Sequence, residues 1–203
     1  MTQRYDRPAD QPEEVEVTAM LEQAVPVLLE INVPERFKKA EIIGGNIIMS
    51  PLRSAHNLTL HRLMSQLDQQ LPADMLYTSD VLTPFEIEQH EYCPDIAVVP
   101  RAEAEDNNIS VCDPAWIACV FEIISPTTRD FDYGVKVGVY ARSSIAEYVV
   151  FDPYTRSATR YAQPEDGEYT LRQLIHYGKP VHIERPFPIV IETAGLPVDP
   201  AAG

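Results

Sequence analysis

A chain of 203 residues with 45% hydrophobic content can bury one core and is short for more than one domain. Its formal charge of −15 opposes non-specific binding to nucleic acid, although residues 35–62 are locally rich in Arg, Lys and His. Three cysteines, an odd number without zinc-ligand spacing, argue against a disulfide framework and a structural zinc. We find no signal peptide and no apolar run of membrane-spanning length, so we expect a cytoplasmic protein.

The first part of the chain predicts a leader, two helices and a hairpin. Residues 1–17 are polar and charged and are expected to be disordered. A capped amphipathic helix is expected over residues 18–31. Two short strands within residues 40–49 surround Gly44-Gly45, which is a strong hairpin signal. Residues 54–71 carry leucines at helical spacing and predict a second amphipathic helix.

The second part predicts mainly strands. Residues 101–114 are acidic, polar and without periodicity, and we expect a flexible loop or lid. Residues 116–124 form the most apolar strand, and residues 132–143 a helix. Further extended segments are expected at 75–88, 95–99, 147–151, 155–162, 168–171 and 181–184, before a frayed tail at 191–203. The pattern predicts an α/β or α+β fold, a mixed sheet flanked by helices, in a single domain over residues 18–190.

Two carboxylates at apolar strands are the most informative feature of the chain. Asp95 opens the strand Ile-Ala-Val-Val, and Glu122 lies within the apolar run Val-Phe-Glu-Ile-Ile. Acidic residues are depleted from strands, and a buried unpaired carboxylate is costly. Carboxylate oxygens suit Mg²⁺, and a nearby cation can stabilise charge developing on a phosphate. Asp95 and Glu122, together with Lys136 on the following helix and Glu41 in the first hairpin, predict a site that hydrolyses phosphodiesters.

Each of these residues also has a purely structural interpretation. Asp95 could cap a turn, and Glu122 could form a buried ion pair with Lys136 that only supports the fold. Lys136 could instead be a solvated helix residue, and Glu41 an exposed residue of an edge strand. His56 could contact substrate or fix Glu41, but an ordinary histidine at a helix start is the favoured interpretation.

Several motifs together resemble the Uma-two family of restriction-endonuclease-like proteins, within the PD-(D/E)XK nuclease superfamily. The resemblance extends over roughly residues 34–185, with its most specific part at 121–153. The motifs are Ala-Glu-Ile-Ile-Gly-Gly-Asn-Ile-Ile-Met-Ser-Pro in the hairpin, Pro-Asp at residue 95, Glu-Ile-Ile-Ser-Pro-Thr-Thr from residue 122, Asp-Tyr-Gly-Val-Lys-Val-Gly-Val-Tyr-Ala-Arg over 132–142 and Glu-Tyr-Val-Val-Phe-Asp-Pro over 147–153.

The resemblance implies a restriction-endonuclease-like core that carries an extra N-terminal hairpin. It also implies that Asp95 and Glu122 are Mg²⁺ ligands, with the carbonyl of Ile123 as a third. The usual superfamily lysine, two residues after the glutamate, is replaced here by Ile124. The resembled family moves this lysine to the next helix, at the position of Lys136.

Glu41 matches the acidic residue of the family's first hairpin and would bind a second metal ion or orient a water. The Gly44-Gly45 turn departs from the Asp-Gly turn usual in the family, which affects the turn and not the site.

We therefore expect a Mg²⁺-dependent endonuclease that cleaves DNA, with Mn²⁺ as an alternative metal. The resemblance to the superfamily further implies products with 5′-phosphates and a homodimer. A catalytically inactive binding or regulatory module is the first alternative. The charge of −15 favours this alternative, and the intact set of four charged residues argues against it. An acidic interaction protein that mimics nucleic acid and a hydrolase of another phosphoester also stay open, as does dependence on an unidentified protein partner.

Overall fold

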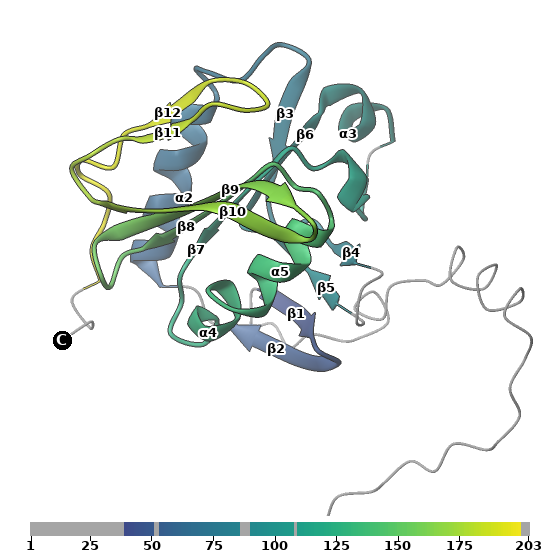
Figure 1. The fold of residues 1–203 in the computed structure, drawn as a ribbon, viewed down its shortest axis with the longest axis horizontal. Helices are drawn as coiled ribbons and strands as arrows, with labels where there is room; N and C mark the ends of the chain where they lie inside the picture. The colour runs from purple at the N-terminus through teal and green to yellow at the C-terminus, as the bar shows by residue number, and fades with distance from the viewer. Residues whose placement is uncertain (1–38, 51–52, 86–89, 108, 200–203) are drawn as a thin grey trace, which may run out of the picture. The chain divides into compact units, whose positions relative to one another are not determined.

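The computed structural model describes residues 39–50, 53–85, 90–107 and 109–199 (Figure 1). The expected leader and the expected helix at 18–31 lie outside these ranges. Among the described helices, none is both long and apolar enough to cross a bilayer. The elements are β1 (Lys39–Ile43), β2 (Asn46–Ser50), α2 (Ser54–Leu67), β3 (Met75–Thr78), β4 (Thr83–Phe85), β5 (His90–Tyr92), β6 (Ile96–Pro100), α3 (Arg101–Asn107), η2 (Pro114–Trp116), β7 (Cys119–Ile123), α4 (Arg129–Asp132), α5 (Val135–Arg142), β8 (Glu147–Asp152), β9 (Ser157–Glu165), β10 (Glu168–His176), β11 (Val181–Ile183) and β12 (Ile189–Ile191).

A six-stranded mixed sheet in the order β10-β9-β8-β7-β6-β3 forms the centre of the described region (Figure 1). β7 and β8 run parallel, and the other neighbours run antiparallel. Every residue of β7 and β8 is buried, as expected for strands that are covered on both faces. The predicted mixed α+β fold is therefore confirmed.

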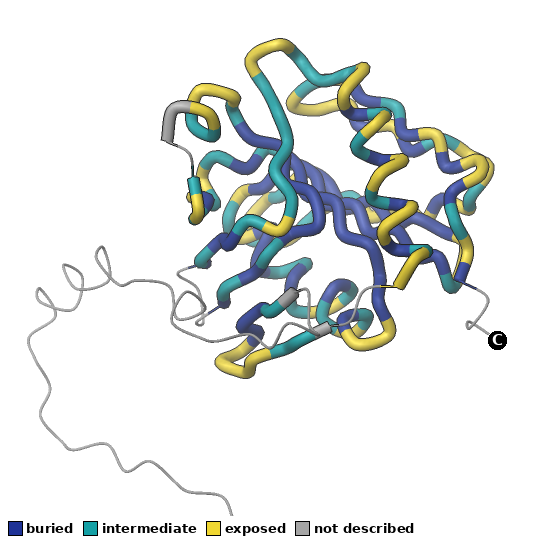
Figure 2. The backbone as a smooth tube through the Cα atoms, turned by 180° about the vertical axis from the view of Figure 1, so that it is seen from behind, coloured by how far each residue is buried: buried dark blue, intermediate teal, exposed yellow. Residues whose placement is uncertain are grey.

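Side-chain alternation along the central strands creates two separate apolar clusters. Phe121, Val149 and their same-face neighbours pack against α2 and the β11–β12 pair. On the other face, Val120, Val150 and their neighbours pack against α5 and against a second sheet of four strands in the order β2-β1-β5-β4. Figure 2 shows the middle strands of the central sheet as buried, whereas the edge strand β10 is mostly exposed. The central sheet thus separates two apolar layers.

The predicted hairpin at 40–49 is confirmed as β1 and β2, which turn at Gly44 (φ 56°) and Gly45 (φ 76°). Two successive positive φ angles suit a tight antiparallel turn, and glycine adopts them without steric cost. The hairpin that the resemblance implied is also joined to a further strand. β1 also pairs with β5, with Ile42 opposite Glu91, so the hairpin belongs to the four-stranded sheet.

The expectation of a flexible loop over 101–114 is wrong for its first half, which forms α3. Arg101 stabilises this helix through an ion pair with Glu105, four residues on, at 2.6 Å. Its guanidinium also donates to the carbonyls of Ala73 and Met75, which fixes the helix start against β3. Because these carbonyl partners are almost thirty residues away, the local sequence gave no sign of them. The expected strand at 116–124 is shorter, since η2 precedes it.

The helix expected at 132–143 is two helices, α4 and α5, which are separated at Gly134. A Cβ atom at this position would lie 2.5 Å from the carbonyl oxygen of Asp130, so the backbone path requires glycine. The predicted helix at 54–71 ends earlier than expected, at Leu67.

Gln66 of α2 and Gln70, in the turn that follows the helix, close the outer edge of β12, a strand that the sequence did not predict. The Gln66 amide accepts from the Glu192 N–H (2.7 Å) and donates to the Glu192 carbonyl (3.2 Å). The Gln70 amide bonds both main-chain groups of Val190 in the same way, at 2.8 and 2.9 Å. The four-residue spacing of the two glutamines, across the end of α2, thus matches the two-residue repeat of the strand.

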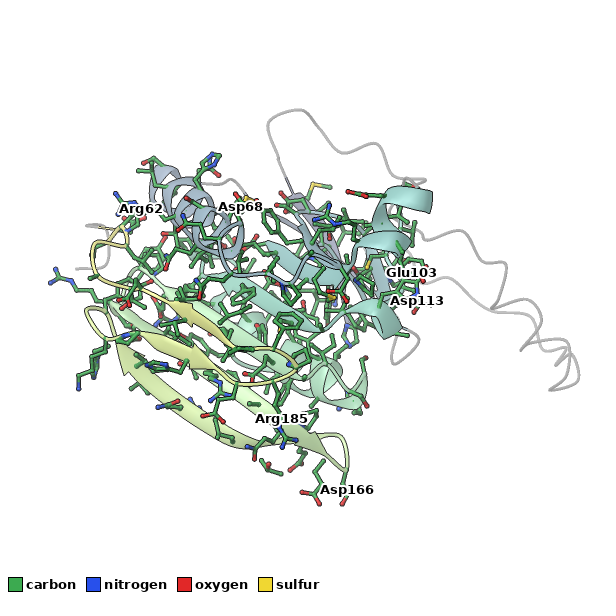
Figure 3. All side chains as sticks on the ribbon, turned by 90° about the horizontal axis from the view of Figure 1, so that it is seen from above. Arg62, Asp68, Glu103, Asp113, Asp166 and Arg185 are labelled. Atoms are coloured by element: carbon green, nitrogen blue, oxygen red, sulfur yellow. The ribbon has the colours of Figure 1, made fainter. Side chains whose placement is uncertain are left out.

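The chain beyond β12 also differs from the expected frayed tail. Thr193, Leu196 and Asp199 are buried, and Leu196 belongs to the apolar cluster beneath α2. In Figure 3, Arg62 and Asp68 mark the exposed side of α2, and Arg185 marks the turn between β11 and β12.

Gln70→Ala is expected to lower the free energy of unfolding by about 1–3 kcal/mol, because it leaves two main-chain groups of Val190 without partners. Gln69→Ala is the matched control, since Gln69 is exposed and bonds only within its own helix. Urea denaturation of the three proteins measures the difference. Equal losses in both variants would show that the edge of β12 does not depend on this contact.

Candidate active site

Strand register brings the two predicted carboxylates together. β6 and β7 pair antiparallel with Ile96 opposite Phe121, and one further residue along this register places Asp95 opposite Glu122. The Asp95 N–H lies 3.4 Å from Glu122 Oε2. Both residues are only 2% exposed. By alternation they face the layer that contains α5 and the four-stranded sheet.

Asp95 is held by two groups from different elements. Its Oδ2 accepts a hydrogen bond from the Ile123 N–H at 2.7 Å and lies 3.0 Å from His56 Nε2. His56 is buried in the first turn of α2. His56 thus stands at a helix start, as the favoured interpretation expects, and also contacts Asp95; a role for His56 in the chemistry stays a prediction.

Lys136 is the centre of the site. Its Nζ lies 2.9 Å from Glu122 Oε1, 3.0 and 3.2 Å from the two oxygens of Glu41, and 3.0 Å from Asp132 Oδ1. The side chain is fully buried, and its Nζ lies 5.2 Å from the ring centroid of Tyr92. Lys136 is thus not a solvated helix residue, and Glu41, at 1% exposure, is not an exposed edge residue.

The sequence analysis missed two members of this group, Asp132 and Tyr140. Each lies four residues from Lys136, one on either side. The Tyr140 hydroxyl donates to Glu122 Oε1 at 3.1 Å, beside the lysine ammonium. Lys136 and Tyr140 are four residues apart on α5, a spacing that places their side chains on one helical face and was visible in the sequence. Asp132 lies on α4, before the break at Gly134.

Charge in the site is unbalanced, because the ammonium of Lys136 faces three carboxylates. Burial by itself would lower the pKa of Lys136, but Asp132, Glu122 and Glu41 outweigh it and raise the pKa well above its usual value. Burial raises the pKa of Asp132, against the lowering effect of Lys136. Burial and the neighbouring Glu122 carboxylate also raise the pKa of the Tyr140 hydroxyl. Lys136 therefore stays protonated at neutral pH, and excess negative charge surrounds it.

The donor set is compatible with a hard divalent cation. Asp95 and Glu122 offer carboxylate oxygens on adjacent strands, and Mg²⁺ binds through one or two carboxylates while it keeps several waters. Within the described ranges, no three side chains of the His, Cys, Asp and Glu types form a metal-binding group. A cation here would therefore depend on the two carboxylates together with main-chain oxygens or water.

Comparison with known proteins gives a family and a fold. The sequence matches the Uma2 family, described as "Putative restriction endonuclease", over residues 26–199. The chain is similar to the crystal structure of "a putative nuclease belonging to DUF820" from Anabaena variabilis, with a TM-score of 0.63 and 16% identity. The similarity covers 77% of this chain and 86% of that chain, and at this identity it concerns the fold. No curated protein matches the sequence.

Lys136→Met is expected to destabilise the protein by about 3–5 kcal/mol at neutral pH, because it leaves three buried carboxylates without their cation. The difference from wild type should shrink at acidic pH, where these carboxylates take up protons. Urea denaturation across pH measures both effects. Lys179→Met, at an exposed position, is the control and should change stability little.

Asp132→Asn tests the raised pKa of the buried carboxyl group. Because the pKa of Asp132 is higher in the folded protein than in the unfolded chain, protonation of this carboxyl group stabilises the folded protein at low pH. This stabilisation is lost as the pH rises from the usual pKa of 3.8 through the raised pKa of the folded state. The variant lacks this loss, so its free energy of unfolding should fall less with rising pH than that of wild type. Asp166→Asn, in an exposed turn, is the control; a wild-type pH profile for Asp132→Asn would contradict the expectation.

Proposed function

Because the chain belongs to the Uma2 family, as its motifs indicated, we propose that it is a metal-dependent endonuclease that hydrolyses DNA phosphodiester bonds. Family and fold support a nuclease function in general. The observation that carries the specific proposal is the position of Lys136. Its ammonium lies between Glu122 and Glu41, which come from different sheets, and Asp95 lies beside Glu122.

In this proposal Asp95 and Glu122 would hold Mg²⁺ or Mn²⁺, with the Ile123 carbonyl as a third ligand. A bound divalent cation polarises a phosphate oxygen and lowers the pKa of a coordinated water. His56 and the Ile123 N–H position the Asp95 carboxylate through the same oxygen, Oδ2. Tyr140 positions Glu122 through Oε1. The orientation of both carboxylates is thus fixed by neighbouring groups before substrate binds.

Lys136 would act as a fixed positive charge. Since the surrounding carboxylates raise its pKa well above the usual value, Lys136 stays protonated at neutral pH and cannot act as a general base. Its proposed role is to orient the attacking water or to stabilise negative charge on the phosphate in the transition state. Glu41, whose oxygens both contact the ammonium, would orient a water or bind a second metal ion.

The site is closed in this conformation. Asp95, Glu122 and Lys136 are at most 2% exposed, and His56 is 5% exposed. A phosphodiester therefore reaches these groups only after neighbouring segments move. Such opening is common in enzymes that assemble their site around substrate.

The alternative function is a nuclease-fold module that binds or regulates without cleavage. Two observations favour it, the charge of −15 and the closed site. The two functions differ in metal dependence. A cleaving enzyme should be stabilised by Mg²⁺ or Mn²⁺, because a ligand that binds only the folded state raises the melting temperature.

We expect the protein to nick supercoiled DNA with Mg²⁺ or Mn²⁺, and expect Glu122→Gln and Asp95→Asn to reduce the rate by about 10²-fold or more. Both substitutions preserve side-chain size, so the variants should remain folded. Lys136→Ala should be inactive as well, provided that circular dichroism shows it to be folded. Glu165→Gln, on the exposed turn of the β9–β10 hairpin, is the control and should cleave at the wild-type rate.

Cleavage that persists in Glu122→Gln would remove this residue from the proposed site. Metal-dependent stabilisation without cleavage of DNA would point to another phosphoester substrate or to a missing partner. Neither cleavage nor stabilisation by metal would favour the binding module.

A further inference from the structure

Arg129 lies in the one-turn helix α4 and is oriented by a buried carboxylate. Its Nη2 donates to Asp152 Oδ2 at 2.7 Å, and Asp152 is fully buried at the end of β8. The other carboxylate oxygen of Asp152 accepts from the N–H groups of Tyr154 and Thr155, which fixes it in place. The guanidinium carbon also lies 5.9 Å from the ring centroid of Tyr133. One side of the guanidinium is therefore held by the protein.

The other side of the guanidinium is open to solvent. The Arg129 side chain is 38% exposed, and its contact with Asp152 uses one of its five N–H donors. A guanidinium presents its donors as a rigid planar fork that matches phosphate oxygens. Since Asp152 already fixes the side chain, a phosphate that binds it would cost little further conformational entropy.

Arg129 also lies beside the candidate active site. β7 and β8 pair in parallel with Glu122 opposite Val150, so Asp152 is two residues further along the neighbouring strand and on the same face. Strand geometry puts this displacement at roughly 7 Å along the strand and about 5 Å across it. Asp132, which contacts Lys136, is three residues after Arg129 on α4 and thus on the same side of that helix. The exposed guanidinium and the buried site are therefore neighbours.

We propose that Arg129 binds a backbone phosphate of the DNA strand, next to the phosphodiester that enters the site. This inference rests on the proposed nuclease function and adds a substrate-binding residue to it. A protein of charge −15 repels DNA as a whole, so its contacts depend on locally placed cations. Lys136 and His56 are buried, whereas Arg129 offers exposed donors at the edge of the site.

The test measures DNA binding by the Glu122→Gln protein, which keeps the side-chain size but should cleave about 10²-fold more slowly or less. Arg129→Gln in this background removes the charge and retains an amide that can donate to Asp152. We expect the Kd for a DNA duplex to rise about tenfold, as for loss of one charge-assisted hydrogen bond. The slope of log Kd against log salt concentration should decrease by about 1, since one phosphate contact is lost.

Two variants serve as controls. Arg185→Ala removes one exposed positive charge from the turn between β11 and β12 and should leave both Kd and salt slope unchanged (Figure 3). Arg129→Lys keeps the charge but loses the planar fork, so the salt slope should persist while Kd rises severalfold. A purely structural role for Arg129 would lower the melting temperature without a change in the salt slope.

A second measurement needs no substitution at position 129 and decides the matter if Arg129→Gln does not fold. Phenylglyoxal labelling of Arg129 in the Glu122→Gln protein, read by mass spectrometry, should fall when DNA is bound, while labelling of Arg185 should not. Equal labelling of Arg129 with and without DNA, or equal salt slopes for Arg129→Gln and Arg185→Ala, would overturn the inference and leave the proposed function intact. Absence of any DNA binding by the Glu122→Gln protein would overturn both.

Discussion

The Lys136 ammonium among three carboxylates is the interaction on which the arrangement of this site depends. A buried ammonium is stable only where opposite charges replace the water it has lost. Here the replacements come from β1, β7 and α4, so one side chain joins both sheets and the α4–α5 corner. The break at Gly134 serves the same arrangement, because it turns the chain between Asp132 and the helix that carries Lys136.

In the proposed nuclease function, Lys136 replaces a lysine that would otherwise stand at position 124. Ile124 is 1% exposed and packs in the apolar cluster with Val120 and Tyr148. A lysine there would bury its charge in the core. Lys136 reaches the same carboxylate, Glu122, from the helix that covers this face of the sheet. The positive charge thus reaches the site by a different path while position 124 contributes to packing.

Much of the site could be predicted from sequence, and the limits have physical causes. Glu122 and Asp95 were recognisable because a carboxylate in an apolar strand contradicts local propensity. The pairing of Asp95 with His56, and of Glu41 with Lys136, depends on contacts between residues far apart in the chain. Periodicity carries no information about such contacts. α3 was missed for the same reason, since distant carbonyl groups stabilise its first turn.

The glutamine pair at the end of α2, Gln66 and Gln70, has a consequence for solubility. An exposed strand edge is a template on which another chain can add a strand, and such addition leads to aggregation. Gln66 and Gln70 already bond both main-chain groups of Val190 and Glu192, so β12 offers no such template at these residues. The two glutamine side chains bond this edge as a neighbouring strand would, but they cannot extend the sheet further. The two-stranded β11–β12 unit can therefore remain small and still resist association with other chains.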